Sequence, residues 1–236
     1  MSIELRHVLI SFAFMGFVSV FGFLYSYLLV SKGLWAEKRF LPGKRKEESY
    51  LQNLPLIVIN LACAYGLTGA GMYYFHDLFI GPSFFGLDIP LPLQVAVEVS
   101  VAVIIDDAYF YFLHRWLHSN KFMYQKVHRI HHRNRQPTPM EYIYTHPLEW
   151  LLGMGGLLVA FFVLQGIAFE SFVVYLFWRT GHELAIHSGL KSSKIVRLIP
   201  YFGTNEHHEL HHAKYDCNYA ATFTIWDKIF GTEIVE

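Results

Sequence analysis

The amino-acid sequence predicts an all-α integral membrane protein with about three transmembrane helices, a helical hairpin that dips into the membrane, and a cytosolic His-rich helical cap. Composition is the first reason, because 53% of the 236 residues are hydrophobic, only 16% are charged, and the mean hydropathy is +0.29. Such a chain is too apolar for an ordinary soluble domain. Long apolar runs in the first half and clusters of histidine in the second half are the other two reasons.

Three apolar runs are long enough to cross a membrane as a helix, which requires about 20 apolar residues. They extend from Val8 to Val30, from Leu54 to Tyr74 and from Leu91 to Leu113. The first run is longer than the core of a cleavable signal and lacks a small-residue cleavage site. We therefore interpret it as a retained span.

The loops between these runs differ in charge and predict the orientation. The 76–90 loop has no Lys or Arg, whereas the first loop carries Lys32, Lys38, Arg39, Lys44, Arg45 and Lys46. By the positive-inside rule the first loop is cytoplasmic and the N-terminus lies across the membrane, so the third run leads to His114 in the cytoplasm. The formal net charge is zero, which gives no reason to expect nucleic-acid binding.

The apolar run from Leu148 to Trp178 predicts the dipping hairpin, with its turn near Gln165 and Gly166. A single crossing would put the last histidines on the opposite side of the membrane from the first, and the two sets would share no metal. Arms of about 14–16 residues need not cross the whole bilayer. The cap would then consist of residues 114–147 and 179–236.

The histidines fall at spacings that favour metal binding. One H-x-x-x-H pattern and two H-x-x-H-H patterns occur, and residues three or four apart share a face of a helix. Unprotonated imidazole is a common ligand of transition metals, and one ion takes four to six donors, so about ten imidazoles predict two metals. The candidate ligands are His114, His118, His128, His131, His132, His182, His187, His208, His211 and His212.

Two of these ligands, His182 and His187, are five residues apart, about 140° around an unbroken helix. They can converge only if the helix ends between them or if each serves a different metal. Gly189 supplies a plausible helix end just after His187.

Other polar residues are expected to support the ligands. Asp107 lies two helical turns before His114, too far to bind the same ion, and we expect it to orient an imidazole from another segment. An aspartate that reaches interfacial water is the alternative. His207 lies about 100° around the helix from the face of the neighbouring histidines. We therefore expect it either to support a metal ligand or to face the substrate.

Four stretches carry a resemblance to a known family, and they read DDAYFYFLHRWLH, KVHRIHHRNRQPTPMEYIYTHPLE, HSG followed by LIPYFGT, and HHELHHAKYDCNYAATFTIWDKIFGT. They resemble the fatty acid hydroxylase/sterol desaturase superfamily, and within it the C-4 methylsterol oxidase and cholesterol 25-hydroxylase-like branch. The resemblance covers about residues 99–232, the catalytic region. Residues 1–98 form a membrane stem, and together they make a single membrane-embedded hydroxylase domain over 1–236.

This resemblance implies a non-haem centre of two iron ions and an enzyme that hydroxylates a sterol or related lipid with O2. Two electrons would come from a small haem protein or an NAD(P)H-linked reductase. His146 and Glu149 of the HPLE element, together with Asn218 and Asp227, would support the ligands. The YDCNYA and HPLE elements point to different branches, so the position oxidised stays open.

Two alternatives remain. Fatty-acyl or sphingolipid hydroxylation, or sterol desaturation, would use the same metal site. A His-rich membrane metal carrier belongs to another class, and it would place ligands along a path inside the spans rather than beyond their ends. We expect the endoplasmic reticulum membrane for a eukaryotic protein and the inner membrane for a bacterial one.

Overall fold

The computed structural model describes residues 2–41, 47–79 and 90–234. Lys44, Arg45, Lys46 and most of the loop predicted on the far side lie outside them. The described part is helical with two isolated β-bridges, which confirms the all-α class. Its helices are α1 (Ile3–Val30), α2 (Glu47–Tyr74), α3 (Leu91–Ser119), α4 (Lys121–Lys126), α5 (Pro147–Gly153), α6 (Gly155–Leu164), α7 (Phe169–Ile186), α8 (Lys194–Leu198), α9 (Asn205–Lys214) and α10 (Ile225–Phe230). Short 3-10 helices are η1 (Ala36–Lys38), η2 (His76–Phe79), η4 (His128–Arg133) and η5 (Pro139–Ile143).

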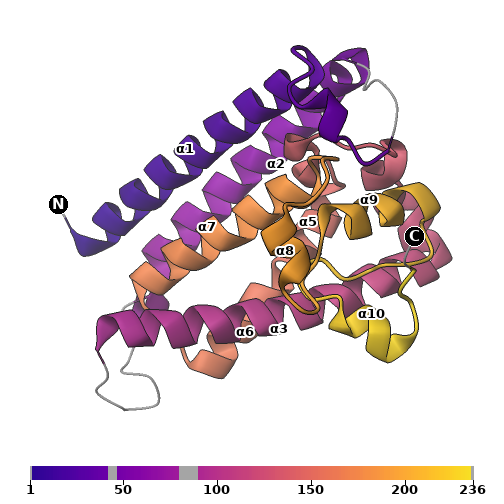
Figure 1. The fold of residues 1–236 in the computed structure, drawn as a ribbon. Coiled ribbons are helices and arrows are strands. Elements are labelled where there is room, and N and C mark those ends of the chain that lie inside the picture. Colours follow the sequence, from indigo (N-terminus) through magenta and orange to yellow (C-terminus); the bar gives the residue numbers. More distant parts are fainter. Residues whose placement is uncertain (1, 42–46, 80–89, 235–236) are drawn as a thin grey trace.

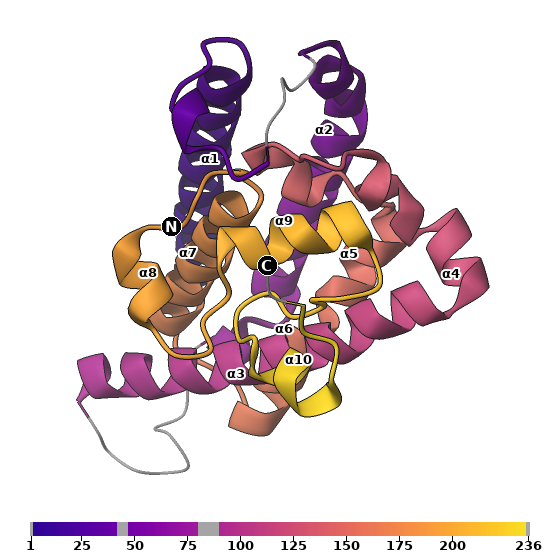
Figure 2. The same cartoon turned by 45° about the vertical axis from the view of Figure 1, so that its right-hand side comes forward.

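Long helices form the frame of the molecule. Helix α1 packs against α2 and α7, and α3 runs across them and contacts α6 and α7 (Figure 1). The short helices α8, α9 and α10 lie at the front of the molecule in Figure 2, with α4 at the right of the same view. This part of the molecule contains the histidine clusters.

The predicted hairpin turn is confirmed at Gln165 and Gly166, which have φ angles of 57° and 106°. A side chain on Gly166 would place its Cβ 2.9 Å from the Leu78 carbonyl oxygen, so the close approach favours glycine. The Ile167 N–H donates to that same oxygen at 2.9 Å. Phe169 stacks on His7 with ring centroids 3.9 Å apart, so the turn reaches the end of the molecule where α1 begins.

Three helical segments are long and apolar enough to cross a membrane, at Ile3–Val30, Tyr50–Tyr74 and Pro147–Leu164. The first two match predicted spans. The third is a correction, because we predicted Leu91 to Leu113 instead. Every 18-residue window of α3 contains Asp106 and Asp107 together with Glu98 or Arg115.

Two carboxylates of α3 have polar partners inside the protein. Glu98 is buried and accepts a hydrogen bond from the Ala168 N–H at 2.9 Å, where α7 begins. A carboxylate at the N-terminus of a helix is favoured by the helix dipole. Asp106 pairs with Arg179 of α7 at 3.4 Å. Helix α3 therefore provides its buried carboxylates with partners inside the protein.

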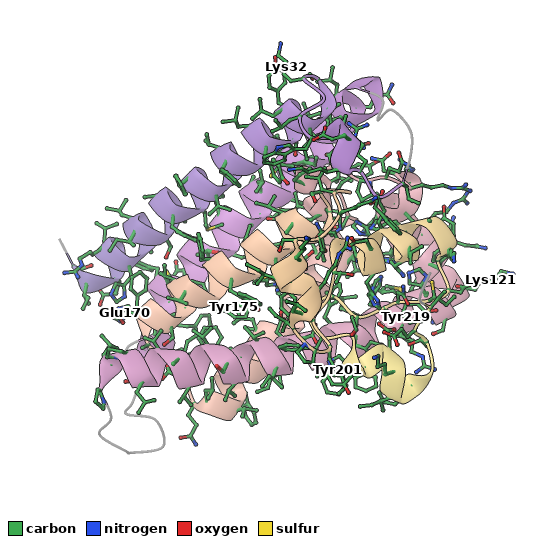
Figure 3. All side chains as sticks on the ribbon, viewed as in Figure 1. Lys32, Lys121, Glu170, Tyr175, Tyr201 and Tyr219 are labelled. Carbon is green, nitrogen blue, oxygen red and sulfur yellow. The ribbon has the colours of Figure 1, made fainter. Side chains whose placement is uncertain are left out.

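The basic loop after α1 lies beside the segment that follows α7. The Phe40 N–H donates to the Gly189 carbonyl at 3.1 Å, and the Lys191 N–H donates to the Lys38 carbonyl at 2.7 Å. Figure 3 shows Lys121 at the opposite end of the molecule from Glu170. The first loop and the histidines thus share one end of the fold, as the charge pattern predicted.

Candidate metal centre

Nine of the ten predicted ligands form two groups in which the candidate ligand atoms lie within 4.8 Å of one another. They come from helices α3 and α9, the 3-10 helix η4 and the C-cap of α7. The first group consists of His114, His118, His128, His132 and His211, and the second of His131, His187, His208 and His212.

The spacing of the ring nitrogens fits shared ions. In the first group, Nε2 of His128 lies 2.9 Å from Nε2 of His118 and 3.0 Å from Nε2 of His132. In the second, Nε2 of His208 lies 3.0 Å from Nε2 of His187. Two imidazoles bound at about 2.1 Å to one ion, at right angles, have nitrogens roughly 3.0 Å apart. The donor set therefore fits transition-metal binding in both groups.

Adjacent histidines separate into different groups. His131 and His132 lie in η4, where successive residues point about 120° apart, and the structure divides them between the groups. His211 and His212 of α9 are divided in the same way, about 100° apart. Each H-x-x-H-H pattern therefore contributes two imidazoles to one group and one imidazole to the other.

Outer hydrogen bonds fix the tautomer of several rings. Nδ1 of His114 lies 2.7 Å from the Tyr219 carbonyl oxygen, and Nδ1 of His211 lies 2.6 Å from the Cys217 carbonyl oxygen. Nδ1 of His187 lies 2.9 Å from the Glu183 carbonyl oxygen. A ring that donates its Nδ1–H to a carbonyl keeps Nε2 unprotonated, which is the form that binds a metal.

Burial keeps these imidazoles neutral. Removal from water lowers the pKa of His128 to about 3 and that of His131 to about 4. Burial, reinforced by neighbouring imidazoles, also holds the pKa of His211 well below its ordinary value. The site therefore presents uncharged donors at neutral pH.

Glu149 and two residues of the C-terminal segment, Asn218 and Asp227, form hydrogen bonds with histidine residues. Glu149 accepts a hydrogen bond from Nδ1 of His128 at 2.8 Å. Nε2 of His207 lies 3.0 Å from Oδ2 of Asp227, which also accepts from the Ala220 N–H at 2.9 Å. Asn218 donates to the His207 carbonyl at 3.2 Å. The bonds of Asp227 and Asn218 hold the segment after α9 against His207 in the first turn of that helix.

Asp107 has a different role from the one expected. Its carboxylate accepts hydrogen bonds from the Thr222 and Phe223 N–H groups at 2.8 and 3.1 Å, and from the Trp226 indole at 2.8 Å. It anchors the backbone after α9 instead of orienting an imidazole. This contact could not be inferred from local sequence patterns, because more than a hundred residues separate the partners.

Two further histidines predicted as site residues also lie outside the groups. The ring of His182 has its Nε2 3.0 Å from the Ala221 carbonyl oxygen and stacks on Trp178. His146 is the N-cap of α5, where its Nδ1 accepts from the Leu148 N–H at 3.0 Å. The structure brings neither ring to the convergent nitrogens.

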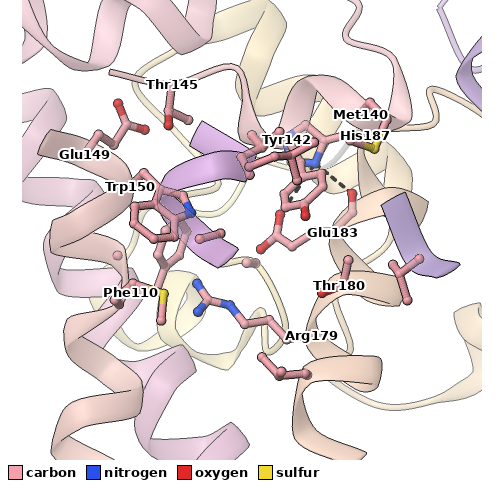
Figure 4. A pocket seen from close by; sticks show the side chains of 18 of the residues that line it. Phe110, Met140, Tyr142, Thr145, Glu149, Trp150, Arg179, Thr180, Glu183 and His187 are labelled. Atoms are coloured by element: carbon pink, nitrogen blue, oxygen red, sulfur yellow. Dashed lines mark hydrogen bonds and ion pairs between the residues drawn. The ribbon is translucent and has the colours of Figure 1, made fainter. Parts of the chain in front are cut away.

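A cavity lies beside both groups and extends between the long helices. Its wall includes His114 and His208, and also Val18 of α1 and Leu61 of α2. Figure 4 shows Phe110 and Trp150 on one side and Arg179, Glu183 and His187 on the other. Arg179 was not predicted as a site residue, although its four-residue spacing from Glu183 and eight-residue spacing from His187 place all three near one helical face.

The fold and the site define a membrane protein with two buried groups of imidazoles that can hold metal ions. The fatty acid hydroxylase family model matches residues 99–232, and the chain belongs to this family. Methylsterol monooxygenase 1 of Gallus gallus is 36% identical over 169 residues, 69% of this chain and 54% of that protein. Methylsterol monooxygenase 1-3 of Arabidopsis thaliana is 32% identical over 155 residues, 63% of this chain and 52% of that protein. The chain thus spans about half the length of these curated relatives. No solved structure matches it.

Proposed function

We propose that the protein is a membrane di-iron monooxygenase that hydroxylates a sterol or related lipid with O2 and two electrons. The observation that carries this proposal is the pair of neutral imidazole groups at the wall of one largely apolar cavity. The names of the relatives, methylsterol monooxygenases, support a sterol as substrate.

In this proposal each imidazole group holds one iron. His114, His118, His128, His132 and His211 would hold the first, and His131, His187, His208 and His212 the second. Bound iron would supply the oxidising power to break an unactivated C–H bond, which no side chain can provide. His182 is left out of this ligand set because its Nε2 faces a carbonyl oxygen.

The chain's own contribution is orientation and exclusion of water. Glu149 and the carbonyl oxygens of Tyr219 and Cys217 hold the imidazoles with Nε2 facing inward. The walls from α1 and α2 are mostly apolar, so a lipid can displace water as it fills the cavity. Holding one carbon atom of the lipid beside the histidines would favour its oxidation, because the reacting groups are already in the required geometry.

The membrane arrangement suits a lipid that arrives sideways from the bilayer. Phe14 and Val18 of α1 and Ala64 of α2 line the cavity within two of the apolar segments. We place the cap in the cytosol, where a small haem protein or an NAD(P)H-linked reductase would deliver electrons. The membrane would be the endoplasmic reticulum in a eukaryote or the inner membrane in a bacterium.

Labelled oxygen gas tests the proposal. The purified protein, loaded with iron and given a reductant and a panel of sterols and acyl lipids, should insert one labelled atom into a sterol. Failure to label any lipid would refute a monooxygenase. A new double bond without label would indicate a desaturase. Rapidly exchanging zinc in place of two tightly held irons would favour a metal carrier.

A further inference from the structure

An arginine lies in the wall of the cavity beside the histidines. Arg179 of α7 is the one Lys or Arg among the described residues that line it. About a quarter of its side chain is accessible (24%), and Figure 4 shows the guanidinium pointing into the cavity. A cation in an apolar cavity is costly unless it is paired, so its retention needs an explanation.

Asp106 supplies part of that explanation. Its Oδ2 lies 3.4 Å from Nε of Arg179, and Tyr175 is a further neighbour on the same helix. A guanidinium has five N–H donors in one plane. With Nε turned to Asp106, terminal N–H groups remain to face a molecule in the cavity.

The local charges select the type of group that these donors accept. Asp106 already balances the charge of Arg179, and Glu183 lines the same cavity one helical turn further along. A carboxylate on the ligand would add a negative charge to a region that already holds two carboxylates. A neutral oxygen accepts a hydrogen bond from Arg179 without that repulsion.

We propose that Arg179, positioned by Asp106, is a specificity-determining residue that donates a hydrogen bond to a hydroxyl oxygen of the lipid. This inference rests on the proposed function and deepens it. The same cavity is lined by His128, His131 and His208, so fixing one oxygen at Arg179 would set which carbon lies beside the histidines. Arg179 would thus govern both the choice of lipid and the position oxidised.

Equilibrium binding to the iron-loaded protein in lipid nanodiscs tests this inference with two pairs of probes. One pair is cholesterol and the same sterol without its hydroxyl group, and the other is octadecanol and octadecane. The wild-type protein should prefer the hydroxylated member of a pair by on the order of tenfold or more. Arg179→Met should remove that preference and leave the affinity for the deoxy member unchanged, and Arg179→Lys should keep part of it.

Controls separate recognition from misfolding. Arg197→Met removes an arginine that pairs with Glu206 on the surface, and it should keep the full preference. The double variant Asp106→Asn with Arg179→Met removes the paired carboxylate together with the arginine, and it should lose the preference while keeping bound iron. The inference would be overturned if Arg179→Met, alone or combined with Asp106→Asn, left the preference unchanged. It would also be overturned if the wild-type protein showed no preference. A preference for octadecanol over octadecane, without one for cholesterol over its deoxy form, would support the role of Arg179 and contradict a sterol as the ligand.

Discussion

Oε1 of Glu149 lies 2.8 Å from Nδ1 of His128, and this contact joins the first turn of α5 to the histidines of η4. The carboxylate accepts a hydrogen bond from the Nδ1–H group of His128. The Nε2 atom of that ring is then unprotonated and faces His118 and His132. Partners of this kind orient a metal ligand and raise its basicity. The pair therefore links the HPLE element to the metal centre.

Removing this carboxylate should weaken metal binding without removing a ligand. We expect Glu149→Ala to lower the affinity for iron by about 10–100-fold, because His128 loses the acceptor that fixes its tautomer. Glu149→Gln keeps an amide oxygen as acceptor and should lose less. Competition with a chelator measures the affinity, and Glu170→Ala, an exposed residue at the far end of the molecule, is the control. An unchanged affinity in Glu149→Ala would show that the contact has no such role.

Adjacent histidines of α9 should belong to different metals. We expect His211→Ala to lose metal from the first group and His212→Ala from the second, with activity lost in both, because each ring contributes to one group. His131→Ala should resemble His212→Ala. Iron content per chain and product formation are the measurements.

Two other histidines are matched controls for this experiment. His182 faces the Ala221 carbonyl, and His76 stacks near His7 at the end where α1 begins, so their alanine variants should keep their iron. Full iron content and activity in His211→Ala would mean that the α9 histidines are not a ligand set.

The candidate ligand residues were predictable because their spacing is a local property of the chain. The turn at Gln165 and Gly166 and the side on which the first loop lies were predictable for the same reason. The sequence could not reveal that Asp106 pairs with Arg179, since this contact depends on how α3 packs against α7. Without that partner, α3 resembled a lipid-facing span.

The division of neighbouring histidines also depended on tertiary structure. Periodicity shows that His131 and His132 point apart, but it does not show that two different groups receive them. That result requires α9 to lie beside η4, where Nε2 of His211 approaches Nε2 of His132 at 3.2 Å. Asp107 was misassigned because its backbone partners at Thr222 and Phe223 become neighbours only in the folded chain.

Asp227 should be a main contributor to the stability of the C-terminal segment. It is fully buried and accepts hydrogen bonds from the Tyr219 and Ala220 N–H groups, both at 2.9 Å, and from the Thr232 hydroxyl at 2.6 Å. Asp227→Asn places an amide N–H₂ against these donors and should lower the free energy of unfolding by about 2–4 kcal/mol. Denaturant titration in detergent measures the change, with the exposed Asp216→Asn as control. Equal stability of the two variants would contradict this role.

Acid should destabilise the metal-free protein. Burial lowers the pKa of His128 from 6.5 to about 3 and that of His131 from 6.5 to about 4, so below pH 6.5 the unfolded chain binds protons that the folded chain refuses. The free energy of unfolding therefore falls as the pH drops from 6.5 toward these values, by about 1.4 kcal/mol per pH unit for each such histidine. Denaturant titrations between about pH 7.5 and 5 on protein stripped of metal measure the slope of this free energy against pH. The decrease should begin near pH 6.5, the pKa of these histidines in the unfolded chain. His131→Asn removes one titrating group and should flatten the slope, whereas Glu170→Ala should not. A free energy of unfolding that does not change below pH 6.5 would mean that the histidines are not buried as neutral donors.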